Sequence, residues 1–172
     1  MNANLSDERE ARMETMIRQW GTSVLRTCFV CLSDAQQAED AMQDTFLKAW
    51  RNLDQFERRN GASEKTWLMH IALNVCRDYR RTRWFRHVDM TRALEDIPLH
   101  VDSALPEDRE LLMEVLNLPE KFRQPLLLYY YQEMTLEEVA EALGASKSTI
   151  HNRLRRAEDM LKITLTGGDC YV

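Results

Sequence analysis

Apolar residues recur at three- and four-residue steps along most of the chain, the spacing of one helix face. The first such stripe predicts a helix from Asp7 to Leu32. A second stripe follows Asp34 and Gln37, a pair with the spacing of a capping box. A third follows Ser63, a suitable N-cap. The inward residues should form one bundle; they are Met13, Met16, Ile17, Trp20, Val24 and Cys28, then Ala38, Met42, Phe46, Ala49 and Leu53, then Leu68, Ile71, Ala72, Val75 and Tyr79.

The composition changes after this bundle. Residues 89–114 hold eight acidic and two basic side chains, and Pro98 and Pro106 interrupt any long helix there. Helical stripes then resume over 111–118, 122–131, 136–143 and 147–165. The sequence therefore predicts an all-α chain: a first unit over 7–88, a flexible acidic linker over 89–110, a second unit over 111–165 and a loose tail over 166–172.

The segment from Thr135 to Leu161 has the features of a helix-turn-helix. Thr135 and Glu138 have capping-box spacing at the start of a short helix. Gly144 ends that helix and supplies a tight turn, and Ser146 caps the next helix. Two short helices joined by a turn with Gly are typical of DNA-binding proteins.

The second helix of this pair carries its polar groups at its N-terminal end and along one flank. Such groups meet base edges and phosphates when a helix N-terminus enters the major groove. A solvated helix in an ordinary bundle is the alternative, but the capping box, the turn and the basic face occur together here. The candidate DNA-contacting residues are Lys147, Ser148, Thr149, His151, Asn152, Arg153, Arg155 and Arg156.

A second basic face lies on the third predicted helix. Residues 76–87 carry five Arg against one Asp, with Tyr79, Trp84 and Phe85 between them. Guanidinium groups neutralise phosphates and aromatic rings stack on bases, a combination suited to single-stranded or opening DNA. A basic helix packed on an acidic partner fits the same pattern. The face consists of His70, Asn74, Arg77, Arg81 and Trp84.

Composition narrows the classes of function. The 172 residues carry a net charge of -5, which argues against a free-standing protein that binds DNA strongly. No apolar run approaches the ~20 residues of a membrane span, and the polar first ten residues hold no signal-peptide core. We expect a cytoplasmic protein.

Taken together, the chain resembles the extracytoplasmic-function (ECF) group of the sigma-70 family of bacterial RNA polymerase sigma factors. Residues 38–56 resemble the helix of sigma region 2 that binds core polymerase, and residues 66–81 resemble the helix that reads the promoter −10 element. Residues 118–162 resemble region 4, which reads the −35 element. The resemblance implies a factor that binds core RNA polymerase, directs it to promoters and promotes their melting.

The resemblance also implies partners and residue roles. Region 2 should bind the polymerase clamp helices, region 4 the polymerase flap, and an anti-sigma factor should sequester the protein. No catalytic residue, cofactor, metal or membrane insertion is implied. The core-binding positions are Asp40, Gln43, Asp44 and Lys48, and the −10 positions are Thr66, Trp67, His70, Asn74, Arg77, Arg80 and Arg81.

Two other classes of protein fit parts of the sequence. A stand-alone helix-turn-helix regulator would explain the second unit, but it should bind its operator without polymerase. Cys28 and Cys31 have CxxC spacing, and with Cys76 and His70 they could make a redox or zinc site. Cysteine acting as a small apolar residue within a helix is the interpretation we favour.

Overall fold

The computed structural model describes residues 2–57, 63–82 and 109–165, and every secondary-structure element in these ranges is helical. The predicted all-α fold is confirmed. The expected linker lies almost entirely outside the described residues, as do the tail and the aromatic positions Trp84 and Phe85. The unit boundaries placed at 88 and 110 therefore stay predictions.

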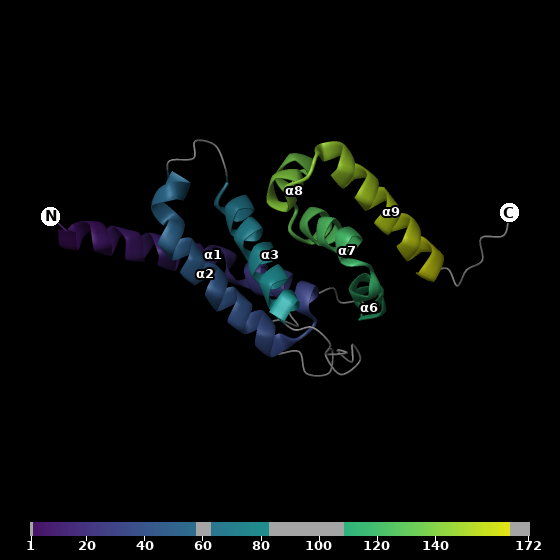
Figure 1. The fold of residues 1–172 in the computed structure, drawn as a ribbon, viewed down its shortest axis with the longest axis horizontal. Coiled ribbons are helices and arrows are strands. Elements are labelled where there is room, and N and C mark those ends of the chain that lie inside the picture. Colours follow the sequence, from purple (N-terminus) through teal and green to yellow (C-terminus); the bar gives the residue numbers. More distant parts are fainter. Residues whose placement is uncertain (1, 58–62, 83–108, 166–172) are drawn as a thin grey trace.

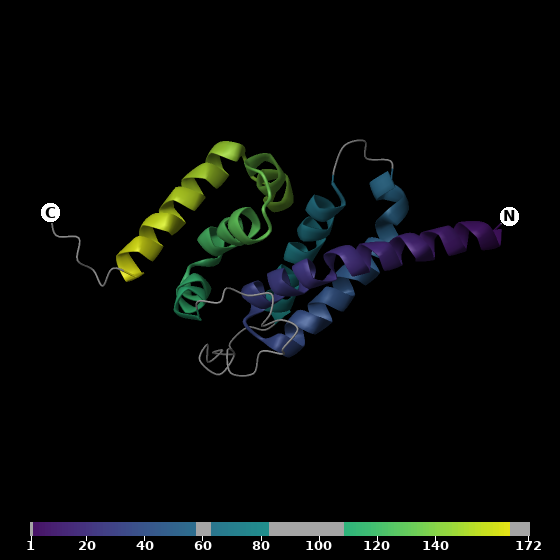
Figure 2. The ribbon, with the colours of Figure 1, turned by 180° about the vertical axis from the view of Figure 1, so that it is seen from behind.

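Three long helices form the first unit: α1 (Asn2–Leu32), α2 (Ala35–Glu57) and α3 (Glu64–Thr82). They pack on one another, and the N-terminal end of α1 projects from the body (Figures 1 and 2). The fully buried side chains at their centre include Val24, Phe29, Leu53 and Leu68. Helix α1 begins five residues before the predicted start at Asp7.

The helix starts follow the predicted caps. The backbone N–H of Gln37 donates to Asp34 Oδ1 at 3.0 Å, and the N–H of Thr66 donates to Ser63 Oγ at 3.1 Å. The Gln37 side chain also donates to the Asp34 carboxylate at 2.6 Å. Both helices therefore start where expected.

The second unit consists of α6 (Arg109–Asn117), α7 (Glu120–Leu126), a π-helical turn η1 (Leu127–Tyr131), α8 (Leu136–Leu143) and α9 (Lys147–Leu165). Helix α6 starts two residues before the predicted 111. The stripe over 122–131, expected to be one helix, is α7 followed by η1. The N–H of Gln132 donates to the Leu127 carbonyl at 3.1 Å, the five-residue step of a π-helix.

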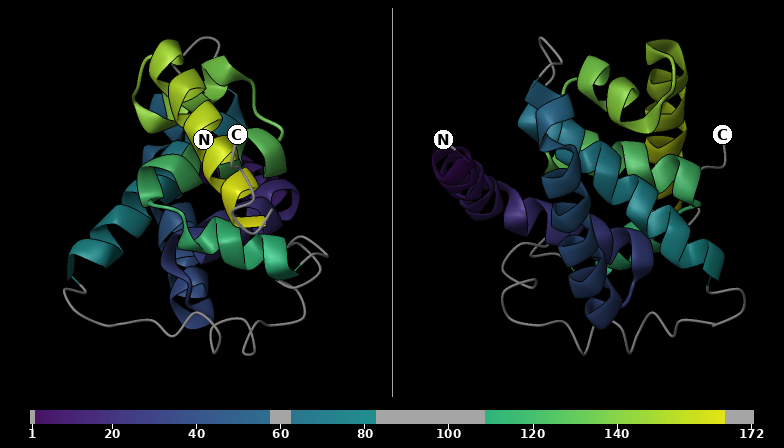
Figure 3. Two further views of the ribbon diagram at one scale, coloured as in Figure 1. Left: turned by 90° about the vertical axis from the view of Figure 1, so that its right-hand side faces the viewer. Right: turned by 60° about the vertical axis from the view of Figure 1, so that its left-hand side comes forward.

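The two units are packed together. Helix α8 lies beside α3, and α9 lies across α7 and α8 on the side away from the first unit (Figures 1 and 3). Helix α3 buries more residues than its predicted stripe, because it packs on α1 and α2 as well as on α8. Leu68, Ala72 and Val75 are buried as expected, and Met69, Leu73 and Cys76 are buried as well. None of the described helices has the length and apolar character needed to cross a bilayer.

Candidate functional site

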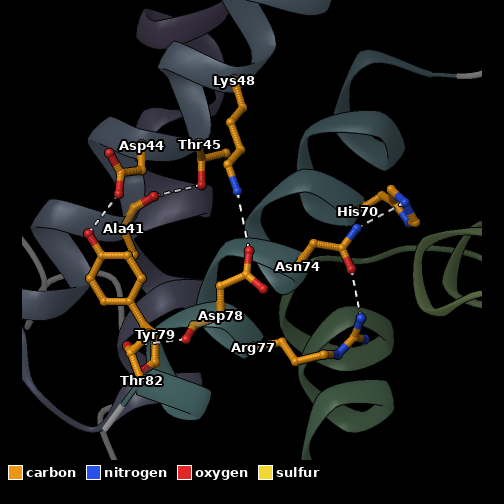
Figure 4. Close-up of polar contacts among 10 residues, drawn as sticks. All are labelled: Ala41, Asp44, Thr45, Lys48, His70, Asn74, Arg77, Asp78, Tyr79 and Thr82. Carbon is orange, nitrogen blue, oxygen red and sulfur yellow. Dashed lines mark hydrogen bonds and ion pairs between the residues drawn. The ribbon is translucent and has the colours of Figure 1, made fainter.

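The candidate core-binding residues of α2 divide into two pairs. Asp40 and Gln43 are exposed, one helical turn apart. Asp44 accepts a 2.7 Å hydrogen bond from the Tyr79 hydroxyl of α3, and Lys48 pairs with Asp78 of α3 at 3.4 Å (Figure 4). Asp40 and Gln43 are therefore available to a partner, while Asp44 and Lys48 connect α2 to α3.

The bond between Tyr79 and Asp44 also affects the pKa of the phenol. Desolvation, with the hydrogen bond to the Asp44 carboxylate as the second cause, raises the pKa of Tyr79 to about 12. The phenol stays protonated at neutral pH and keeps donating to the carboxylate. This contact fixes the position of α2 relative to α3, the two candidate binding helices of the first unit.

An apolar groove between α1 and α2 borders the exposed pair, and the sequence patterns did not reveal it. Its volume is ≈ 630 Å³, and two of its apolar residues, Ile17 and Leu47, are 46% and 53% exposed. Ile17 was expected to face the core of the bundle. A three- and four-residue stripe cannot distinguish a core contact from an open groove, because both lie on the same side of a helix. The remaining lining residues are Glu10, Met13, Glu14, Met42, Gln43, Phe46 and Trp50.

The candidate −10 residues at the start of α3 are internal. Thr66 is 1% exposed, and its hydroxyl lies 2.7 Å from Ser63 Oγ in the helix cap. Trp67 is 8% exposed and stacks on Phe56 of α2, with ring centroids 4.5 Å apart. Neither side chain is presented to a DNA strand in this arrangement, so both support the helix start.

The other candidate −10 residues form a polar row along α3. Arg77 donates to Asn74 Oδ1 at 2.8 Å, and the amide of Asn74 lies 3.1 Å from His70 Nε2 (Figure 4). His70 Nδ1 lies 3.0 Å from the Ala142 carbonyl of α8. Arg80 forms an ion pair with Glu120 of α7, and Arg81 is exposed. The row is therefore organised partly by the second unit.

The helix-turn-helix forms as predicted. Thr135 and Glu138 make both bonds of the capping box, with Glu138 N–H to Thr135 Oγ1 at 3.3 Å and Thr135 N–H to Glu138 Oε2 at 2.8 Å. Gly144 has φ +60°, the left-handed conformation that glycine adopts without steric cost. The N–H of Thr149 donates to Ser146 Oγ at 3.2 Å, which caps α9.

The apolar stripe of α9 packs against the other helices of the second unit, and its polar flank faces solvent. Ile150, Leu154 and Ala157 are buried. At the start of the helix, Lys147 pairs with Glu137 of α8, and the Ser148 and Thr149 hydroxyls lie 3.1 and 2.8 Å from Ser146 Oγ. The exposed members of the candidate −35 set are Lys147, Ser148, His151, Asn152, Arg155 and Arg156; Thr149 and Arg153 are half-buried.

Comparisons with known proteins agree with this arrangement. Residues 16–86 match the family model described as Sigma-70 region 2, and residues 116–162 match the model described as Sigma-70, region 4. The matched parts contain most of α1, all of α2 and α3, and the helix-turn-helix. The chain belongs to the sigma-70 family.

Curated relatives place this sigma-70 family chain in the ECF group. It is 32% identical to RNA polymerase sigma factor YlaC of Bacillus subtilis over 161 residues, covering 90% of this chain and 92% of the relative. It is 30% identical to ECF RNA polymerase sigma factor SigL of Mycobacterium tuberculosis, covering 90% and 89%. ECF RNA polymerase sigma factor SigW of Bacillus subtilis is 29% identical, with 81% of each chain covered.

Solved structures share the fold. CnrH, solved in complex with the cytosolic domain of CnrY, has a TM-score of 0.68 and 22% identity, covering 92% of this chain and 90% of that chain. The sigma factor RpoE in complex with the anti-sigma factor NepR, from Bartonella quintana, has a TM-score of 0.69 and 22% identity, covering 89% and 96%.

The cysteines behave as core residues. Cys28, Cys31 and Cys76 are free thiols at 0–3% exposure. A hydrogen bond with Cys76, together with burial, raises the pKa of the Cys31 thiol well above its ordinary value, and a hydrogen bond with Cys28 is the main cause that raises the pKa of Cys76. A nucleophilic or metal-binding cysteine needs the opposite shift. Among the described residues, no three His, Cys, Asp or Glu side chains are grouped as a metal site requires.

Proposed function

We propose that this protein is an RNA polymerase sigma factor that binds core polymerase, directs it to promoters with −10 and −35 elements, and promotes their melting. The observation that carries the proposal is the presence of both sigma-70 regions in order, the second with an exposed polar flank on α9. The protein acts as a dissociable initiation factor and contributes no catalytic centre. It works in the cytoplasm, where polymerase and DNA are found.

The first unit provides the main polymerase contact in this proposal. Asp40 and Gln43 supply exposed polar groups, and Leu47 extends the same surface into the apolar groove. An exposed polar and apolar surface of this kind fits a helix of the polymerase clamp. Asp44 and Lys48 act indirectly, because their bonds to Tyr79 and Asp78 fix α2 against α3.

The −10 element would bind along the polar row of α3. His70, Asn74, Arg77, Arg80 and Arg81 supply hydrogen-bonding and cationic groups for a displaced strand. Thr66 and Trp67 fix the start of this helix and make no direct contact. A flipped base would have to be captured by residues 58–62, which lie outside the described ranges, or by groups exposed after rearrangement.

The −35 element would bind the N-terminal end and outer flank of α9. Arg155 and Arg156 lie on the exposed flank, where they can reach phosphates or base edges in the major groove. The flap of polymerase would hold this unit at a fixed separation from the first. Two modest DNA-binding surfaces then act together through the shared scaffold.

An anti-sigma factor is the expected inhibitory partner. The structure of RpoE, which has a similar fold, is a complex with the anti-sigma factor NepR. The exposed Ile17 and Leu47 of the groove give such a partner an apolar surface on this chain.

Run-off transcription tests the proposal. Purified core polymerase is mixed with fragmented genomic DNA of the source organism, with and without the protein. Defined transcripts that appear only with the protein support a sigma factor. Protection of specific DNA sites by the protein alone, with no effect on core polymerase, would instead support a stand-alone regulator.

A further inference from the structure

A carboxylate lies beside the polar row of α3. Asp78 follows Asn74 by four residues, and Asn74 follows His70 by four, so the three side chains line one face of the helix at steps of about one turn (Figure 4). The neighbouring Arg77 and Arg81 are exposed, and so is Asp78. An acidic group therefore stands at the edge of the surface that we assign to a DNA strand.

The carboxylate of Asp78 is held through one of its two oxygens. Its Oδ2 accepts from the ammonium group of Lys48 on α2 at 3.4 Å (Figure 4). The side chains of Lys48 and Asp78 are 47% and 60% exposed. Within the described ranges, no other side chain donates to the second oxygen, Oδ1. The pair therefore leaves one acceptor oxygen for a ligand.

Neither stability nor phosphate binding accounts for an acid at this place. Exposed ion pairs contribute little to folding stability. Helices α2 and α3 are already joined by the hydrogen bond between Tyr79 and Asp44. The stack of Trp67 on Phe56 joins them a second time. For phosphates a carboxylate is unfavourable, because it repels the backbone that the arginines attract.

Recognition of a base is a task for which a carboxylate is suited. An ionised carboxylate only accepts hydrogen bonds, so it selects for donors. Adenine, cytosine and guanine carry an exocyclic amino group, whereas thymine has none. In duplex DNA the same chemistry pairs Asp or Glu with the amino group of cytosine. A base of a displaced strand also exposes the edge that is paired in the duplex, so any of the three amino groups can reach such an acceptor.

We propose that Asp78 is a specificity-determining residue for the −10 element, and that its carboxylate accepts a hydrogen bond from the exocyclic amino group of one base of the displaced strand. Lys48 is its positioning partner, because it holds the carboxylate through Oδ2 and offsets its charge. The inference rests on the proposed function, in which α3 binds this strand. The arginines contact phosphates and orient the strand, while Asp78 selects the base.

The test removes single amino groups from the DNA. A promoter found by run-off transcription is synthesised with its non-template strand altered at one −10 position at a time. Each position receives adenine, cytosine or guanine, or the matching analogue without the amino group, which is purine, 2-pyrimidinone or hypoxanthine. The rate of abortive initiation is measured with core polymerase saturated with the full-length protein. The analogues change duplex stability equally for all protein variants, so the ratio of base to analogue is compared between variants.

The expected result is a loss of preference at one position only. There the wild-type protein should prefer the amino base to its analogue by roughly tenfold, the size of one hydrogen bond to a charged group. Asp78→Ala should remove this preference and leave the other positions unchanged. Asp78→Asn should relax it, because an amide can donate to a keto group as well as accept from an amino group. The three analogues identify the base that supplies the amino group.

Lys48→Ala is the matched control, because it breaks the same ion pair and keeps the carboxylate. It should slow initiation from all templates alike, since the uncompensated charge of Asp78 repels the strand, and it should retain most of the amino preference. If the pair only held α2 against α3, Lys48→Ala and Asp78→Ala would have the same effect on every template. Urea unfolding of both variants measures any change in stability.

The outcomes separate this inference from the proposed function. The role of Asp78 is overturned if the wild-type protein initiates but Asp78→Ala keeps its ratio of base to analogue at every −10 position. It is also overturned if the wild-type protein initiates and shows no amino preference at any of these positions. A wild-type protein that never starts transcription with core polymerase would refute the sigma-factor proposal, and this inference with it.

Discussion

Helices α3 and α9 are both basic and amphipathic, but the chain uses them differently. The polar flank of α9 faces solvent, and Lys147 at its start pairs with Glu137 of the same unit. The polar row of α3 is bound through His70 and Arg80 to the other unit. The comparison shows that a basic face in the sequence identifies a candidate DNA-binding surface. It does not show whether other parts of the chain already contact that surface.

Trp67→Ala should have the largest effect and tests whether the start of α3 is structural. The ring is 8% exposed and stacks on Phe56, so we expect a loss of about 3–5 kcal/mol in the free energy of unfolding. Urea unfolding measures this loss. Trp67→Phe, which keeps an aromatic ring against Phe56, should retain most of the stability. A Trp67→Ala protein with unchanged stability but no promoter melting would make Trp67 a direct DNA contact.

The double variant Asp40→Ala, Gln43→Ala should have the second-largest effect. Both side chains are exposed, so the double variant should lose core-polymerase binding by at least about 2 kcal/mol, the size of a hot-spot contact, without loss of stability. Co-purification with core polymerase and urea unfolding measure the two effects. Asp44→Ala should show the reverse pattern, because it leaves the half-buried Tyr79 hydroxyl without its acceptor. Normal core binding by the double variant would refute the role given to this surface.

Arg155→Ala tests the comparison on helix α9. One lost DNA contact should weaken −35-dependent initiation by ~1–3 kcal/mol and leave the unfolding free energy unchanged. Arg80→Ala on α3 differs in one respect: it also breaks the pair with Glu120 of α7, so it should lower the free energy of unfolding by up to about 1 kcal/mol. Equal unfolding free energies of the two variants would remove the distinction between the two helices.

Lys147→Ala should have the smallest effect. Its hydrogen bond to Glu137 is the main cause that lowers the pKa of this carboxyl, so the substitution should raise that pKa toward its ordinary value. The contribution of the pair is present above the ordinary pKa of a glutamate and is lost as the pH falls through the lowered value. An NMR titration of the Glu137 carboxyl measures the change, and an unaltered titration would contradict the pairing.

Much of the fold could be predicted from local patterns. The positions of α2, α3, α8 and α9 follow from caps and apolar stripes, and Ile150, Leu154 and Ala157 of α9 are buried. The π-helical turn could not be anticipated, because a stripe over residues 122–131 is compatible with either helix period over so short a stretch. The packing of α8 on α3 depends on residues far apart in the chain, which periodicity does not report.

The candidate site was predictable to a similar extent. The resemblance assigns core binding to Asp40, Gln43, Asp44 and Lys48, and this stays a prediction. Only the tertiary structure shows that Asp44 and Lys48 bond to α3, whereas Asp40 and Gln43 are exposed. The sequence also left open whether the basic helix binds DNA or packs on an acidic partner. The structure shows that α3 packs on the second unit through His70 and Arg80.

Footprinting of one promoter with and without core polymerase tests the central claim most directly. The promoter is chosen from the run-off transcripts, and permanganate reactivity of thymines near −10 reports melting. The account predicts protection near −10 and −35, and reactive thymines, only when the protein and core polymerase are both present. Equal protection and melting by the free protein would contradict it.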